Sequence, residues 1–203
     1  MNKNVNLIIP DSGPLISLAH ANRLDLVEVF DLPVAVLDVV KLECLKKPNS
    51  PDHERMANWF LRHSNRIRVV ESPFGQIYRA ALADEQSGAK PRATRGLGDA
   101  AIAWLIPNIS EVASHDAIPL VLLEDRNLSI TLSTGMAHIL STRTWLVGLE
   151  QAGVIKSAAE VITQIGNHGR ALSSLQVDRP ATVDQINTSW IDALSKGRGG
   201  MGD

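Results

Sequence analysis

The sequence contains one cysteine, Cys44, among 203 residues. A lone thiol can form neither an internal disulfide nor a cysteine-based zinc cluster, so we expect Cys44 to be a small buried residue on a helix. No apolar run approaches the roughly 20 residues that a membrane-spanning helix needs, and the first residues lack the layout of a signal peptide. We therefore expect a soluble, cytoplasmic protein that does not contact a membrane.

Aromatic residues are also scarce, at 4% of the chain. Modules that only bind single strands stack bases on aromatic rings, so this scarcity argues against a pure binding function. The formal net charge is −2, with a pI near 6.3, so the molecule as a whole does not attract nucleic acid. Any affinity for nucleic acid must come from a local basic patch.

Short apolar runs alternate with helical segments along a chain that is 44% hydrophobic. The expected buried strands are Val5 to Ile9, Val34 to Leu37, Ile67 to Val70 and Leu120 to Leu123, with a shorter extended piece from His138 to Leu140. The expected helices are about Leu15 to Ala19, Leu24 to Phe30, Val39 to Leu45, Asp52 to His63, Phe74 to Asp84, Gly98 to Leu105, Asn127 to Leu132 and Arg143 to Gln151. This alternation predicts an α/β fold with a mainly parallel central sheet.

Three further local features are predicted. Asp38 stands where an N-cap is expected, and the segment from Glu85 to Gly98, with Lys90, Arg92 and Arg95, resembles a mobile basic loop. We expect a main domain over residues 1–155 and a C-terminal helical extension over residues 156–203. Within this extension the pattern predicts helices over about 156–175 and 182–194 and a flexible glycine-rich tail from residue 197.

Four acids stand at positions where parallel sheets bind ligands. Asp11 and Asp125 stand where two expected strands end, Glu43 lies on the helix after another strand, and Asp99 opens a helix. Crowded carboxylates repel one another and raise one another's pKa unless a cation holds them. Mg²⁺ and Mn²⁺ prefer oxygen ligands and can activate a water for attack on phosphorus. This set therefore favours a metal-dependent nuclease.

Each acid also has a structural interpretation. Asp11 could cap the following helix, Asp99 could complement a helix dipole, and Glu43 could be a solvated surface charge, as most of the 22 Asp and Glu residues are expected to be. A small nucleotide-binding domain is a weaker alternative, because the sequence has no GxxxxGK[ST] loop.

In combination, these segments resemble the motifs of the PIN domain family. The strings are Ile8 to Ala19 (IIPDSGPLISLA), Val40 to Glu43 (VKLE), Gly96 to Ala103 (GLGDAAIA) and Leu122 to Arg126 (LLEDR), in the family's order and approximate spacing. Residues from Ser141 to Leu149 and from Ala152 to Ile155 resemble the helix after the last core strand in a branch of prokaryotic PIN proteins. The resemblance covers about residues 6–155.

The resemblance implies a PIN-like α/β/α sandwich and a Mg²⁺- or Mn²⁺-dependent endoribonuclease. It implies an RNA substrate and, as in VapC-type proteins, the toxin of a toxin–antitoxin pair with an antitoxin partner. The implied metal-binding and catalytic acids are Asp11, Glu43, Asp99 and Asp125, with Glu124 as the alternative to Asp125. A nuclease acting on DNA and a catalytically silent RNA- or protein-binding module remain open.

Several other residues are candidates around these acids. Arg92, Arg95, Arg126 and Arg143 are candidates for holding phosphate, since guanidinium pairs bidentately with its oxygens; solvated surface arginines are the alternative. Ser12, Ser141 and Thr142 are candidate hydroxyls behind the ligands, although turn and cap roles explain them equally well. Apolar faces at residues 15–26 and 145–165 exceed what one small sheet needs, which favours a homodimer, unless they are ordinary core.

Overall fold

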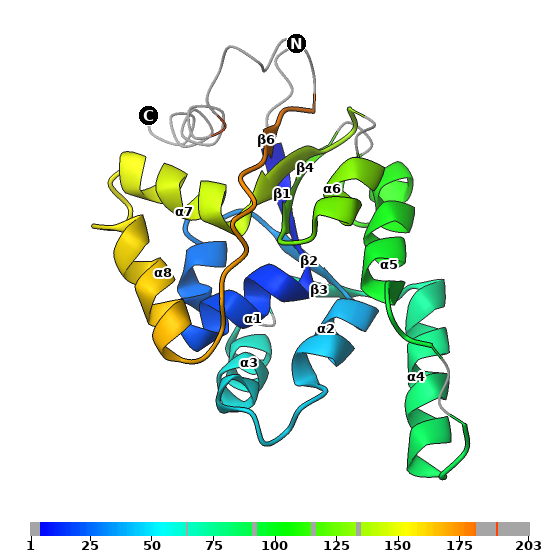
Figure 1. Ribbon diagram of the computed structural model, residues 1–203. Helices are drawn as coiled ribbons and strands as arrows, with labels where there is room; N and C mark the ends of the chain where they lie inside the picture. Colours follow the sequence, from blue (N-terminus) through cyan, green and yellow to red (C-terminus); the bar gives the residue numbers. More distant parts are fainter. Residues whose placement is uncertain are drawn as a thin grey trace.

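A six-stranded sheet forms the centre of the computed structural model, which describes residues 5–63, 65–90, 93–114, 117–132, 135–181 and 190 (Figure 1). Its strands are β1 (Val5–Pro10), β2 (Val34–Leu37), β3 (Ile67–Val70), β4 (Ile118–Leu123), β5 (His138–Ser141) and β6 (Asp178–Arg179). They lie in the order β3-β2-β1-β4-β5-β6, and every neighbouring pair is parallel except β5 with β6. The predicted α/β class and mainly parallel sheet are confirmed.

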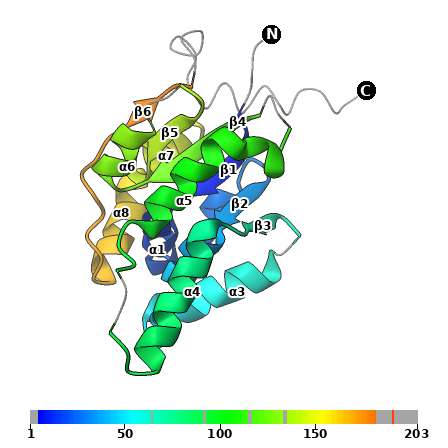
Figure 2. The ribbon, with the colours of Figure 1, turned by 90° about the vertical axis from the view of Figure 1, so that its right-hand side faces the viewer.

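Helices cover both faces of this sheet. They are α1 (Ser12–His20), α2 (Asp38–Leu45), α3 (Pro51–Arg62), α4 (Pro73–Gln86), α5 (Leu97–Leu105), α6 (Arg126–Thr131), α7 (Thr142–Gln151) and α8 (Ala158–Asn167), with the 3-10 helices η1 (Leu24–Val27) and η2 (Ile106–Glu111). Figure 1 shows α1, α7 and α8 on one side of the sheet and α5 and α6 on the other. In Figure 2, as in Figure 1, the far end of α4 projects beyond the sheet.

The apolar runs became strands because a parallel sheet buried on both faces needs apolar residues at every position. All six residues of β4 and all four of β2 are buried, and Ile8 and Ile9 of β1 are completely covered. Burying one such side chain stabilises the fold by about 1.5–3 kcal/mol, so the buried residues of β1, β2 and β4 contribute much of its stability.

Asp38 is not the N-cap that we predicted. Leu37 occupies the cap position, and Asp38 is the first residue of α2. Its Oδ1 accepts hydrogen bonds from the Val39 amide at 2.9 Å and from the Ser72 hydroxyl at 2.7 Å, so Asp38 joins α2 to the start of α4. A Cβ at Gly75 would lie 1.6 Å from Asp38 Oδ2, so this contact requires glycine at position 75.

The helix predicted over residues 156–175 was wrong in its second half. Helix α8 ends at Asn167, and Gly169, with φ +84°, has the left-handed conformation that ends helices. Residues 168–177, here called the C-terminal strap, then run irregularly to β6 (Figure 1). The helix predicted over residues 24–30 is likewise only the short η1. The predicted helix over residues 182–194 and the tail from 197 lie outside the described residues, apart from Trp190.

The apolar faces from which we predicted a homodimer are core within the chain. Leu15 and Leu18 of α1 are fully buried, as are Trp145 and Leu149 of α7, and Ile165 of α8 packs beside them. The alternative interpretation, ordinary core, therefore holds for most of these faces, although Val147 and Val154 are exposed. The homodimer keeps only the family resemblance as its basis, and the domain division at residue 155 stays a prediction.

In the part of the chain that the structure describes, no helix combines the length and the hydrophobicity needed to cross a bilayer.

Candidate active site

The four predicted acids lie at the carboxyl edge of the sheet. Asp11 follows β1, and its amide donates a 2.9 Å hydrogen bond to the Leu122 carbonyl, which fixes the end of β1 beside the end of β4. Asp125 lies just beyond β4, between that strand and α6. Glu43 lies on α2, after β2, and Asp99 is in the first turn of α5. Four separate chain segments thus deliver one carboxylate each to this edge.

Asp11 is the most buried of the four, with 7% of its surface exposed. Burial raises its pKa from 3.8 to about 7; the Ser12 amide lowers it, and the charges of Asp99 and Glu43 raise it further. Asp11 occupies the N-cap position of α1, and its carboxylate interacts with the Ser12 and Gly13 amides of the first turn. The pKa of Asp11 therefore places its titration near neutral pH.

Glu43 has two hydrogen-bonding neighbours, Ser12 and Gly98. Burial raises its pKa, a hydrogen bond from the Ser12 side chain lowers it, and the charge of Asp99 raises it. The backbone of Gly98 also lowers this pKa by hydrogen bonding. A Cβ at Gly98 would lie only 3.0 Å from Glu43 Oε2, so the carboxylate packs directly on the backbone of α5.

Asp99 interacts electrostatically with the more buried acids and with the exposed Asp125. Burial raises the pKa of Asp99, and the charge of Asp125 raises it further. Asp125 is exposed, and its Oδ1 accepts a 2.6 Å hydrogen bond from the Asn127 amide at the start of α6. Asp11, Glu43, Asp99 and Asp125 therefore form an electrostatically linked set, here called the acid quartet.

The donor chemistry of the acid quartet fits a hard divalent cation. All four groups are carboxylates, and the raised pKa of three of them is the effect that a bound cation would reverse. Within the described residues, no three His, Cys, Asp or Glu side chains are positioned to hold a metal ion together as they stand. The residues thus fit Mg²⁺ or Mn²⁺ in kind, and binding would require the side chains to close in.

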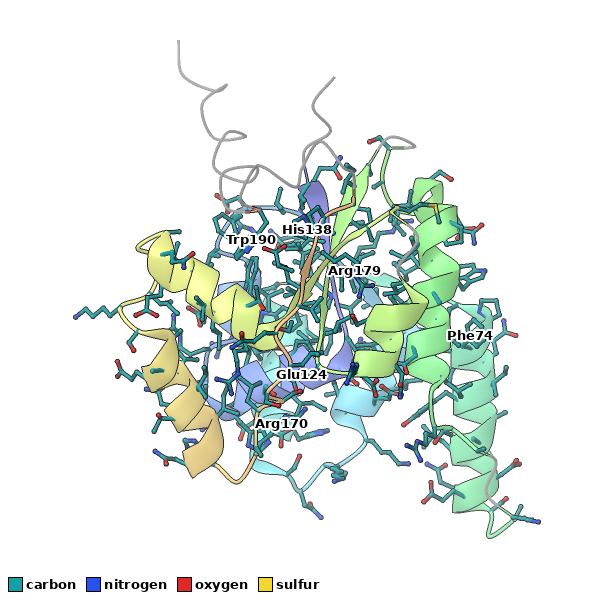
Figure 3. The ribbon with its side chains drawn as sticks, turned by 45° about the horizontal axis from the view of Figure 1, so that its top comes forward. Phe74, Glu124, His138, Arg170, Arg179 and Trp190 are labelled. Carbon is teal, nitrogen blue, oxygen red and sulfur yellow. The ribbon has the colours of Figure 1, made fainter. Side chains whose placement is uncertain are left out.

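Glu124, the alternative to Asp125, is held by other parts of the chain. Its Oε1 accepts a 3.0 Å hydrogen bond from the Thr142 hydroxyl, and its Oε2 pairs with the Arg170 guanidinium at 3.1 Å. Figure 3 shows Glu124 and Arg170 side by side. Arg170 also donates to the Ser17 hydroxyl at 2.7 Å and to the Gly13 carbonyl at 3.2 Å. Glu124 therefore anchors the strap, whereas Asp125 belongs to the acid quartet through its charge interaction with Asp99.

The predicted phosphate-binding arginines have different surroundings in the part of the chain that the structure describes. Arg95 and Arg126 are exposed, and Arg92 lies outside the described residues. Arg143 donates to the Ser173 carbonyl at 3.4 Å, so it contacts the strap.

Of the three predicted hydroxyls, two contact acids: Ser12 bonds to Glu43, and Thr142 to Glu124. Ser141 caps α7 through the Thr144 amide and also accepts a hydrogen bond from the Val177 amide. It supports the strap rather than the acids.

Arg170 is the main residue near this edge that the sequence did not indicate. It lies 46 positions from Glu124 and 153 from Ser17, in an irregular segment with no periodicity. No local pattern could have predicted these contacts.

Comparisons of the chain with protein-family models, with curated proteins and with solved structures returned no match. A functional proposal therefore depends on the residues and their arrangement.

Proposed function

We propose that this chain is a Mg²⁺- or Mn²⁺-dependent endoribonuclease with a PIN-like fold. The observation that carries the proposal is the convergence of Asp11, Glu43, Asp99 and Asp125 on one sheet edge, where three of them have raised pKa values. Structural acids of a surface have no reason to gather from four chain segments, since like charges repel. Perturbed, clustered carboxylates are typical of functional sites.

In this proposal the acid quartet holds the cation. When bound, the ion supplies an acidified water and stabilises charge on the reacting phosphate. Asp11, at the end of β1, is the most buried ligand, and the Ser12 side chain holds Glu43 by a hydrogen bond. The bare backbone of Gly98 leaves room for the Glu43 carboxylate. Asp125 provides the solvent-facing ligand, where an incoming strand can reach the site.

The test offers labelled RNA and DNA side by side to purified protein with Mn²⁺. We expect internal cleavage of RNA that a chelator abolishes and that Asp11→Asn lowers at least a hundredfold. The matched control is Asp25→Asn, which removes an exposed aspartate paired with Arg23. Cleavage of DNA alone would identify a related DNA nuclease. Binding of RNA with no cleavage in any metal would identify a silent binding module.

Through its resemblance to VapC-type proteins, we also propose that the chain is a cytoplasmic toxin with a protein antitoxin and that it forms a homodimer. Expression of the parent, but not of Asp11→Asn, should arrest bacterial growth, and co-expression of the neighbouring reading frame should relieve the arrest. Light scattering at micromolar concentration should give twice the chain mass of 22.0 kDa. A monomer would contradict the dimer.

A further inference from the structure

A groove of about 360 Å³ opens beside the acid quartet, between the ends of α1 and α2 and the strap. Glu43 lines this groove and also belongs to the acid quartet, so the two features adjoin. Three cationic side chains also line the groove: Lys46 and Lys47 after α2, and Arg170 from the strap. We call this feature the α2 groove.

Lys46 and Lys47 are the cations in the α2 groove that are available to a ligand. Both are exposed, and neither makes a side-chain hydrogen bond or ion pair with any residue that the structure describes. The charge of Lys46 lowers the pKa of Glu43, so this lysine acts directly on the quartet. Arg170, by contrast, already pairs with Glu124.

The acids that line the groove do not neutralise the positive charge of these two lysines. Asp52 is buried, and His20 Nε2 lies 3.6 Å from its Oδ1. Glu43 belongs to the quartet, where a cation would neutralise it. The two lysines therefore present positive charge toward solvent, immediately beside the proposed reaction centre.

The lining also limits how a nucleic acid could bind. It contains no Phe, Tyr or Trp side chain, and its one ring, that of His20, is mostly covered beside Asp52, so bases have no exposed platform on which to stack. Its volume is in the range of small-ligand pockets, which is far too small for a duplex. Ammonium groups bind phosphate as point charges and read no sequence.

We propose that the α2 groove binds the sugar–phosphate backbone of a single RNA strand, with Lys46 and Lys47 contacting phosphates next to the scissile one. This inference rests on the proposed function and adds the path of the substrate. It also means that the groove does not select the target sequence.

Binding is measured by fluorescence anisotropy with a labelled single-stranded oligouridine in Mg²⁺ buffer, on the Asp11→Asn protein to prevent cleavage. Lys46→Gln with Lys47→Gln should raise Kd about tenfold and reduce the log–log salt slope by roughly 1.4, since each phosphate contact on a single strand contributes about 0.7. The matched control, Arg62→Gln with Lys156→Gln, removes two exposed cations that do not line the groove. The Kd and the salt slope of this control should equal those of the Asp11→Asn protein without further substitutions.

Further outcomes separate the two proposals. If the lysine variant binds as tightly as the control, or if no protein binds the oligonucleotide, the α2 groove inference is overturned. Lysine-dependent binding that is tighter for a duplex than for a single strand also overturns it. If lysine-dependent single-strand binding is found but the parent cleaves no nucleic acid, the groove stands and the nuclease proposal fails. An oligoadenosine should bind about as well as the oligouridine, because nothing in the groove reads bases.

Discussion

The buried carboxylate of Asp11 should make the metal-free protein less stable as pH rises. Its pKa is about 7 in the folded protein, against 3.8 as the ordinary value. Below pH 3.8 the carboxyl group is protonated in both the folded and the unfolded protein. Between pH 3.8 and 7 the folded protein holds the proton more tightly than the unfolded one. Above pH 7 the group is charged in both. Stability therefore falls from about pH 4 to pH 7 and stays low above that. The full difference corresponds to roughly 4 kcal/mol.

Asp11→Asn removes this charge at nearly constant volume. The free energy of unfolding of the variant, relative to the parent, should be higher at pH 8 than at pH 5 by roughly 2.5 kcal/mol, because the linkage cost is only partly developed at pH 5. Urea titrations at both pH values, with a chelator present, measure the difference. Comparing differences cancels the groups that do not interact with Asp11 and any constant cost of weakened Ser12 and Gly13 amide contacts, while the coupled acids Glu43 and Asp99 contribute to the measured difference.

Asp25→Asn serves as the control, and its effect should be small and equal at the two pH values. A relative stability of Asp11→Asn that does not change with pH would refute the reasoning, since the carboxylate would then carry no burial cost. A change of the opposite sign would mean that the surroundings favour the charged form.

Three further predictions concern the same edge. Mg²⁺ or Mn²⁺ should raise the melting temperature of the parent in calorimetry, because the site exists only in the folded chain, and no shift at millimolar metal would contradict the proposed metal site. Asp125→Asn should lower cleavage with little loss of stability. Glu124→Gln should instead destabilise the fold by about 2 kcal/mol in urea, because Arg170 loses a charged partner. Inactivation by Glu124→Gln with unchanged stability would reverse the roles assigned to the two acids. Gly98→Ala should lower cleavage while far-ultraviolet circular dichroism stays unchanged, since its Cβ would displace Glu43.

Most of the fold could be predicted because its strands are short apolar runs closed by turn residues. The run from Val34 to Leu37 matches β2 at both ends, and Ile67 to Val70 matches β3. Strand β4 begins two residues before the predicted Leu120, because Ile118-Pro119 carries a proline that weakens the strand pattern.

The acids of the candidate site followed from the same strands. Asp11 and Asp125 were found because parallel strands that end together bring their following residues to one edge. The choice between Glu124 and Asp125 needed tertiary contacts, since both follow β4 and a strand buried on both faces gives no alternation to separate them. Asp38 was misassigned because its side chain bonds to Ser72, the residue before α4, and to Arg79 on α4. Such tertiary contacts leave no local pattern in the sequence.

The strap has a consequence for the order in which the molecule folds. Its Arg170 contact with Ser17 spans 153 positions, and such contacts form late, because a long loop must close before they contribute any stability. Every acid of the quartet precedes residue 126 and leaves the ribosome well before Arg170 does. All four acids are therefore synthesised before the guanidinium that pairs with Glu124, and the strap can dock only after residue 170 has been made.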